Sequence, residues 1–241
     1  MSSFFAALRF LTIFPGPMNF PAVDWRLAAI FFPVIGFLLG MILVLVDFPL
    51  RLLASPGLCG TLLVSILVFL TGSLHLDGLS DTFDGLGAGG DRDRMLNVMD
   101  DSHVGAFGMV AVVLVLVLKI EAIQSMDLDR WRALLAAPVL SRWAMVVLGY
   151  RALAAKPGLG SSLIDHLETK HVVLASLVSV ILVIAILRIT GVALIFLTVL
   201  FTWLIKTYFH FRLGGITGDI FGAVGELTET FALVFLALGA R

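Results

Sequence analysis

The 241-residue chain is 60% hydrophobic and only 14% charged, with a mean hydropathy of +1.08. A soluble domain is usually about a quarter charged and under half apolar, so this composition predicts a multispan protein embedded in a lipid bilayer. The net charge of −1 argues against nucleic acid as a partner, and the single cysteine, Cys59, excludes an intrachain disulfide.

Apolar segments follow one another along most of the chain and predict an all-α, polytopic membrane helix bundle of about seven transmembrane helices. Before them, the N-terminal stretch predicts a short interfacial helix, because Arg9 interrupts its apolar run and Pro15 ends it. The last segment is short and needs Leu227 and its neighbours to approach the ~20 residues of a spanning helix. We see no repeat or soluble insertion, so residues 1–241 are expected to form one transmembrane domain. The predicted spans cover residues 27–46, 59–74, 105–123, 133–154, 172–187, 192–205 and 231–238.

The acidic residues are concentrated in residues 72–108, which hold seven of the seventeen in the chain. Asp77, Asp81 and Asp84 stand at i, i+4 and i+7, so on a helix they share one face within roughly 60°. Like charges at this spacing repel one another unless a cation neutralises them, and hard oxygen ligands suit Mg²⁺, Mn²⁺ or Ca²⁺. The glycines of residues 85–90 allow backbone to approach a ligand closely. The stretch therefore predicts a divalent-metal site, with a solvated acidic loop as the alternative.

Two cations lie inside apolar spans, where a charge is expensive and normally faces a cavity or a partner. For Arg142 we predict a phosphate contact, with snorkelling to the interface as the alternative. The same argument applies more weakly to Lys119, for which Glu121 is a simple partner.

A second glycine-rich stretch, residues 214–226, breaks the apolar pattern directly after the sixth span and is predicted to be a loop. Its glycines permit close approach to phosphate, and Asp219 can supply a metal ligand or orient a reacting group. A flexible turn with solvated acids is the alternative. Glu226 and Glu229 are expected to face water at the start of the last helix, where the helix dipole favours acids.

The distribution of Lys and Arg predicts the orientation across the membrane. With the N-terminus in the cytoplasm, nine of these residues fall inside and five outside, and residues 72–108 and 214–226 both face the cytoplasm. The inside set is Arg9, Arg26, Arg92, Arg94, Arg151, Lys156, Lys170, Lys206 and Arg212, and the outside set is Arg51, Arg130, Arg132, Arg188 and Arg241.

The acidic stretch reads His75-x-Asp77-Gly78-x-x-Asp81-x-x-Asp84-Gly85, followed by Met99-x-Asp101-Ser102-x-x-Gly105-x-Phe107-Gly108. This pattern resembles that of the cobalamin synthases, or adenosylcobinamide-GDP ribazoletransferases. The likeness extends over nearly the whole chain, through residues 10–15, 32–36, 141–143 and 214–219.

The resemblance implies a specific reaction in the last steps of cobalamin biosynthesis. The ribose 3′-hydroxyl of α-ribazole, or of its 5′-phosphate, attacks the cobinamide-bearing phosphate of adenosylcobinamide-GDP, and GMP leaves. The place is the inner membrane of a bacterial cell, with the active site facing the cytoplasm. A homo-oligomer is compatible with the sequence.

The same resemblance implies roles for individual residues of a single catalytic domain. Mg²⁺, or Mn²⁺, is implied as the cofactor. The implied metal ligands are Asp77, Asp81, Asp84 and Asp101, and His75 or one carboxylate is the base. The predicted catalytic group is His75, Asp77, Asp81, Asp84 and Asp219, and the predicted phosphate-binding group is Arg142, Lys119, Ser102 and Gly85.

Two other functions stay open at this point. The run Asp81-x-x-Asp84-Gly85-x-x-Ala88 also resembles the opening of the CDP-alcohol phosphatidyltransferase signature, but Gly89 stands where the signature has Arg and its later Asp-x-x-x-Asp is missing. A divalent-cation transporter is the non-enzymatic alternative. Transporters place such acids near the midplane and often in two related halves, whereas these acids cluster at one face.

Overall fold

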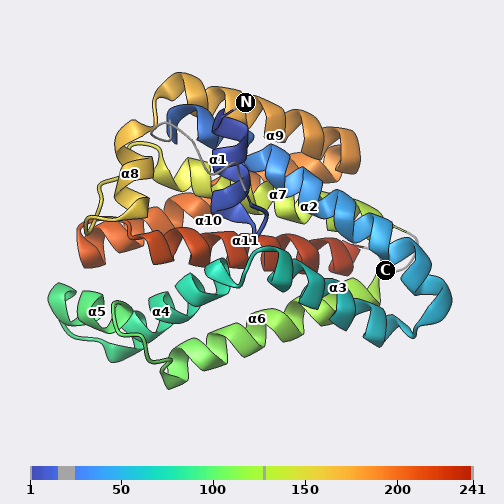
Figure 1. The fold of residues 1–241 in the computed structure, drawn as a ribbon, viewed down its shortest axis with the longest axis horizontal. Coiled ribbons are helices and arrows are strands. Elements are labelled where there is room, and N and C mark those ends of the chain that lie inside the picture. Colours follow the sequence, from blue (N-terminus) through green and yellow to red (C-terminus); the bar gives the residue numbers. More distant parts are fainter. Residues whose placement is uncertain (1, 16–24, 127–128, 240–241) are drawn as a thin grey trace.

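The computed structural model describes residues 2–15, 25–126 and 129–239, which form eleven helices and no strand (Figure 1). The prediction of an all-α protein is therefore confirmed. Arg241, counted above among the outside charges, lies outside the described residues. The helices are α1 (Ser2–Leu11), α2 (Trp25–Leu53), α3 (Pro56–Leu70), α4 (Leu74–Ala88), α5 (Arg92–Met99), α6 (Ala106–Ser125), α7 (Arg130–Gly149), α8 (Leu159–His166), α9 (Thr169–Leu187), α10 (Ile189–Leu213) and α11 (Gly218–Gly239).

Six of the described helices are long and apolar enough to cross a membrane, namely α2, α6, α7, α9, α10 and α11. A seventh crossing is made if the bent pair α3 and α4 is counted as one span. The structure thus agrees with the predicted polytopic bundle of about seven spans.

The second predicted span, residues 59–74, is not straight. The structure ends α3 at Leu70 and turns the chain by 90° before α4. Gly72 and Ser73 in this turn have φ of +61° and +59°, a left-handed conformation that no helix continues through. The 15 residues of α3 reach only about 22 Å, so α3 alone falls short of a hydrocarbon core of ~30 Å.

The last helix begins far earlier than the sequence predicted. Residues 214–226 were expected to form a loop, but α10 continues to Leu213 and α11 starts at Gly218. The glycines were interpreted as a sign of a loop, but in this helix they allow neighbouring helices to pack closely. A Cβ on Gly222 would lie 3.0 Å from the His75 carbonyl oxygen, and one on Gly225 would collide with the Met145 side chain. Small residues at helix–helix contacts are usual in membrane bundles.

Helices α7 and α11 form the centre of the bundle. Helix α7 packs against α2, α9 and α11, and α11 also packs against α4 and α6. At the α2–α7 contact, Gly36 faces the Pro138 carbonyl and Gly40 faces that of Leu134, so closely that a side chain at either glycine would collide with backbone. Both central helices also carry polar and charged side chains that are buried inside the bundle.

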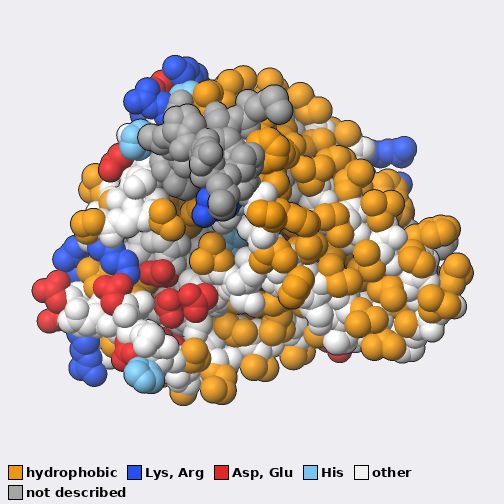
Figure 2. All heavy atoms as spheres, viewed as in Figure 1, with side chains coloured by type: hydrophobic (Ala, Val, Ile, Leu, Met, Phe, Trp, Pro, Cys, Tyr) orange, Lys and Arg blue, Asp and Glu red, His pale blue; other side chains and the backbone are white. Residues whose placement is uncertain are grey.

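Charged side chains gather at one end of the molecule, over α4, α5 and α8, while apolar side chains cover most of the rest of this face (Figure 2). At the polar end, Arg92 donates from Nε to the Leu213 carbonyl (2.7 Å) and from Nη2 to the Ala155 carbonyl (2.6 Å), which ties α5 to the end of α10 and to the segment after α7. At the opposite end, Arg130 donates to Asp47 (Nε–Oδ2 2.9 Å) and ties α7 to α2. Arg92 and Arg130, which were predicted to face opposite sides of the membrane, therefore lie at opposite ends of the bundle. Which end faces the cytoplasm stays a prediction.

Candidate active site

The site begins with a close contact between α4 and α11. A Cβ on Gly78 would lie 2.7 Å from the carbonyl oxygen of Asp219, and Gly222 in the next turn of α11 faces the backbone of His75. Backbones at this distance leave no room for side chains between them. The side chains at the edges of the contact, Asp77 and Asp81 on α4 and Asp219 on α11, are therefore brought together from distant parts of the sequence.

The charges at this contact are unbalanced. The carboxyl group of Asp81 feels the repulsion of Asp77, Asp219 and Asp84, while Lys156 acts on it with the opposite sign. Oxygen donors with excess negative charge have the chemistry of an Mg²⁺ site. Within the described parts of the chain, however, no three carboxylate, imidazole or thiol groups converge closely enough to hold a metal ion as they stand. The donor chemistry fits a divalent cation, and the metal stays a prediction.

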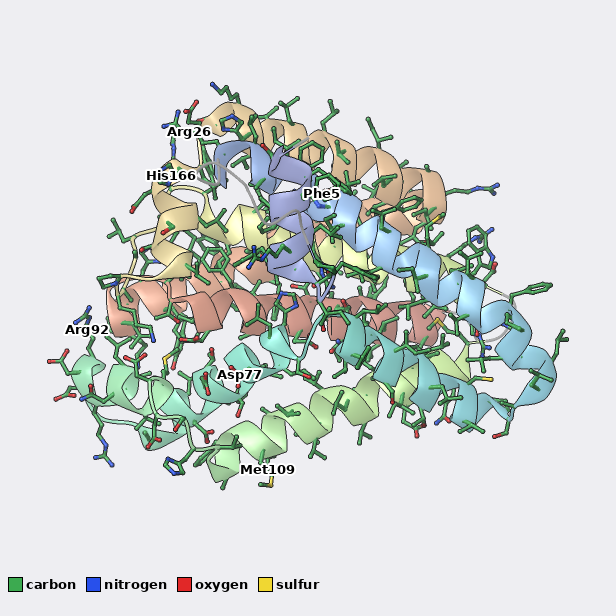
Figure 3. All side chains as sticks on the ribbon, viewed as in Figure 1. Phe5, Arg26, Asp77, Arg92, Met109 and His166 are labelled. Carbon is green, nitrogen blue, oxygen red and sulfur yellow. The ribbon has the colours of Figure 1, made fainter. Side chains whose placement is uncertain are left out.

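A cavity of about 250 Å³ opens beside this contact, between α1, α4, α7, α8 and α11. Three of the predicted catalytic residues line it, namely His75, Asp77 and Asp219. Figure 3 labels Asp77 on α4, with Arg92 of α5 and His166 of α8 at the same end of the bundle. The structure thus brings the beginning of the acidic stretch and the start of α11 to one cavity, which is consistent with their predicted location on the same side of the membrane.

His75 is buried rather than interfacial. Its side chain is 4% exposed, and its Nε2 has no hydrogen-bond partner in the described structure. A histidine near a helix end can also serve as an anchor at the membrane interface, and the burial of His75 argues against that role. A buried imidazole nitrogen without a partner is available to a substrate proton, and the role of base stays a prediction.

Asp84 has a different set of partners from its neighbours on α4. Its two carboxylate oxygens accept hydrogen bonds from the backbone N–H groups of Gly105 and Gly108, both at 2.8 Å. Gly108 has no room for a side chain, because a Cβ would collide with Asp84 and Ser80. The negative charge of Asp84 thus satisfies the open N-terminus of α6 and holds α4 against it.

Asp101 belongs to an exposed turn before α6, next to the exposed Ser102. It accepts hydrogen bonds from the His103 backbone N–H (3.0 Å) and from its Nδ1 (2.6 Å), and these bonds hold the pKa of Asp101 below its ordinary value. Asp84 and Asp101 line a second hollow of about 350 Å³, whereas Asp77 lines the first. The structure therefore divides the predicted metal ligands, because the fourth of them, Asp81, lines neither hollow.

Gly85, predicted to approach a phosphate, faces the interior of the bundle instead. A Cβ there would collide with the Met99 side chain, so this glycine allows α5 to pack against α4. Its place in the structure is a helix contact, outside the lining of the cavity.

The two cations inside the spans form a buried network with acids of α11. Lys119 Nζ donates to Glu226 Oε2 and Glu229 Oε1, both at 2.6 Å, and Arg142 Nη1 donates to Glu229 Oε2. The exposed fractions of the Lys119 and Arg142 residues are 2% and 1%, so snorkelling of Arg142 is excluded. Two positive and two negative groups balance inside the bundle, as buried charges must.

This network corrects several expectations. Glu226 and Glu229 do not face water, and Glu121 does not pair with Lys119. Lys119 and Arg142 were predicted to contact a phosphate, but neither of them lines the cavity beside Asp219. The sequence could have predicted this network. Glu226 and Glu229 share a helix face at i, i+3, and two cations inside the membrane require acidic partners.

Lys156 is the site residue that the sequence analysis missed, since it was counted only as a loop charge. Its Nζ pairs with Asp100 and lies 3.3 Å from Asp219 Oδ2. Burial disfavours the charged ammonium, but the hydrogen bonds and charges of Asp100 and Asp219 outweigh it and hold the pKa of Lys156 above its ordinary value. The residues that follow, Pro157–Ser161, line the same cavity.

The fold and the site together define a polytopic membrane protein with a cavity at one end of its helix bundle, lined by two aspartates, a lysine and a histidine among apolar residues. The chain belongs to the cobalamin-5-phosphate synthase family, whose model matches residues 3–237. The family confirms the resemblance seen in the sequence and makes the protein a transferase. Neither the phosphatidyltransferase nor the transporter alternative is favoured.

Curated relatives match over almost their full length. A protein of Geotalea daltonii named adenosylcobinamide-GDP ribazoletransferase is 41% identical over 242 residues, which cover 99% of this chain and 98% of the relative. Proteins of the same name from Desulforamulus reducens and Acetivibrio thermocellus are 38% and 36% identical, and cover 100% and 95% of this chain with 98% and 94% of their own. No solved structure matches the chain.

Proposed function

We propose that this protein transfers the cobinamide phosphate of adenosylcobinamide-GDP to the ribose hydroxyl of α-ribazole or α-ribazole 5′-phosphate. The products are GMP and adenosylcobalamin or its 5′-phosphate. One structural observation supports the proposal independently of the names of the relatives. The Gly78–Asp219 contact brings Asp77 and Asp219 to the lining of a single cavity at the polar end of a membrane bundle, and Asp81 lies close enough to feel the charge of both.

The chemistry is a phosphoryl transfer without a change of oxidation state. The hydroxyl oxygen of the acceptor forms a new bond to the phosphorus that carries cobinamide, and the bond from this phosphorus to the bridging oxygen of GMP breaks. GMP leaves with that oxygen. The hydroxyl proton passes to a group at the cavity, for which His75 Nε2 and the exposed Asp77 are the candidates. Positioning and charge neutralisation supply most of the catalysis in such reactions.

The acidic cluster fits a role in holding Mg²⁺ or Mn²⁺. Asp77, Asp81 and Asp219 would bind it, because Asp77 and Asp219 both add negative charge around the Asp81 carboxyl group, and a cation there would relieve this repulsion. Asp84 and Asp101 are less suited in this arrangement, because both carboxylates are engaged by other donors. A bound metal ion supplies charge neutralisation and polarisation of the transferred phosphate.

The size of the cavity limits what it can enclose. Pockets that hold small ligands usually measure roughly 300–1,000 Å³, and this one has about 250 Å³. It has room for the reacting phosphate and ribose. The corrin ring and the leaving nucleotide base therefore lie outside it, at the open polar end of the bundle.

The proposed reaction gives a first prediction on metal dependence. Purified protein with adenosylcobinamide-GDP and α-ribazole should release GMP when Mg²⁺ or Mn²⁺ is present. Chelator should abolish the release, and Ca²⁺ should restore little of it, because Ca²⁺ is larger and accepts looser geometries. GMP is measured by chromatography after dialysis against EDTA and metal add-back. Full activity in excess EDTA would reject the metal, and no GMP under any condition would reject the reaction.

A second prediction concerns the orientation in the inner membrane. Ala88 at the end of α4 and the exposed Ser55 between α2 and α3 lie at opposite ends of the bundle (Figure 1). In a Cys59→Ser background, Ala88→Cys should react with an impermeant thiol reagent only from the cytoplasmic side, and Ser55→Cys only from the periplasmic side. The Lys and Arg count is the reason. The reverse labelling pattern would overturn the orientation and the direct access of cytoplasmic nucleotides to the site.

A further inference from the structure

Helix α8 begins at the rim of the acidic cavity. Its first residues, Leu159, Gly160 and Ser161, line the cavity together with Gly158 before them. The first N–H groups of a helix have no partner within the helix, and they carry the positive end of its dipole. A helix start that opens onto a cavity is a common place for a phosphate group.

The start of α11 meets the start of α8 at the same place. A Cβ on Gly160 would lie 2.8 Å from the backbone nitrogen of Gly218, so only glycine permits the two helix starts to approach so closely. Gly158 has φ of +154°, which favours glycine, and nothing lies within 4 Å of the position of its missing Cβ. Two positive helix ends therefore converge on one open region of the cavity rim.

Two side chains at the cavity add polar groups to these helix ends. Lys156 reaches it from the segment before α8 and is held 3.3 Å from Asp219 Oδ2. His75 lines the cavity, is 4% exposed, and has an Nε2 without a hydrogen-bond partner among the described residues. A buried polar atom without a partner costs free energy unless a ligand satisfies it. This histidine is an observation independent of the helix ends, and it too points to a polar ligand.

We infer that the segment Lys156–Ser161, here called the phosphate strap, binds a phosphate group of the substrates in this cavity. The inference rests on the proposed function and deepens it, because it assigns a substrate-binding role to residues outside the acidic stretch. The phosphate has two sources in the proposed reaction. One is the diphosphate of adenosylcobinamide-GDP, and the other is the 5′-phosphate of α-ribazole 5′-phosphate.

The test compares binding by two charge-removing variants of the full-length protein in detergent. Lys156→Gln removes the ammonium of the strap. Lys170→Gln is the matched control, because the Lys170 side chain is 68% exposed and pairs with Glu168 at the start of α9. Calorimetric titrations use GDP, α-ribazole 5′-phosphate and α-ribazole as probes, and thermal unfolding confirms that each variant is folded.

The expected result is a dissociation constant about tenfold higher in Lys156→Gln for a phosphate-bearing probe, on the scale of a lost hydrogen bond to a charged group. A change for GDP assigns the strap to the diphosphate of the donor, and a change for α-ribazole 5′-phosphate assigns it to the acceptor. The affinity for α-ribazole should be unchanged, as should all affinities of Lys170→Gln. Equal affinities of Lys156→Gln and wild type for every probe would overturn the inference, as would an equal loss for α-ribazole.

A second variant tests the backbone of the strap. Gly160→Ala places a methyl group against the start of α11, so it should raise the same dissociation constant while the protein stays folded. Unchanged binding by a folded Gly160→Ala variant would contradict a role for the two helix starts. Failure of the reaction is separate from failure of the strap, because wild-type protein that binds the probes but releases no GMP rejects only the proposed function.

Discussion

Replacement of Asp219 by asparagine is expected to lower turnover by about two orders of magnitude or more, on the scale of losing one charged contact to the transition state. Asp219 lies in the first turn of α11, where its backbone touches Gly78 and its side chain faces the acids of α4. Asparagine keeps the size of the side chain and an acceptor for the Thr217 hydroxyl, which donates to Asp219 Oδ2 at 3.1 Å. The loss should therefore reflect the missing charge.

The control for this prediction is Asp93→Asn. Asp93 is an acid at the same polar end, but its side chain is 83% exposed and pairs with its neighbour Arg92. GMP release by equal amounts of folded protein is the measurement. If Asp219→Asn turns over like wild type, α11 has no part in the catalytic site and the acids of α4 act without it.

Replacement of Glu229 by glutamine is expected to destabilise the protein by about 3–5 kcal/mol, because it leaves a buried positive charge without its counter-charge. Glu229 accepts from Lys119 and Arg142 at once, and the side chains of all three are at most 2% exposed. Glu226→Gln should cost less, because among the described residues Glu226 pairs with one cation, Lys119, whereas Glu229 pairs with two. Thermal unfolding in detergent measures both effects.

A compensating variant separates charge balance from packing. In Glu229→Gln combined with Lys119→Met, one positive and one negative charge are removed together, so much of the lost stability should return. An unfolding temperature of Glu229→Gln equal to that of wild type would show that the buried network does not hold the central helices together.

Much of this protein can be predicted from local sequence. Hydropathy alone sets the membrane class and the approximate number of spans, because a spanning helix must satisfy its own backbone and present apolar side chains to lipid. The spacing of Asp77, Asp81 and Asp84 places them on one helical face, and the structure shows that helix as α4. The motif around them is specific enough to identify the family, which the comparisons confirm.

Glycine was the residue that local sequence could not interpret. Gly72 ends a helix through its positive φ, whereas Gly222 lies inside a helix and lets α11 approach α4. The two uses look alike in the sequence, because an absent side chain permits both an unusual backbone conformation and a close contact. For this reason the sequence predicted one continuous span over residues 59–74, where the chain turns, and a loop over residues 214–226, where α11 has already begun.

The composition and the motif by themselves determined that this is an all-α membrane protein with an acidic site of the cobalamin synthase type. Only the tertiary structure decided which groups meet. It paired Lys119 and Arg142 with Glu226 and Glu229, turned Asp84 to the start of α6, and brought Lys156 to Asp219. Helical periodicity is encoded by neighbouring residues, whereas the partner of a buried charge depends on how helices from distant parts of the chain cross.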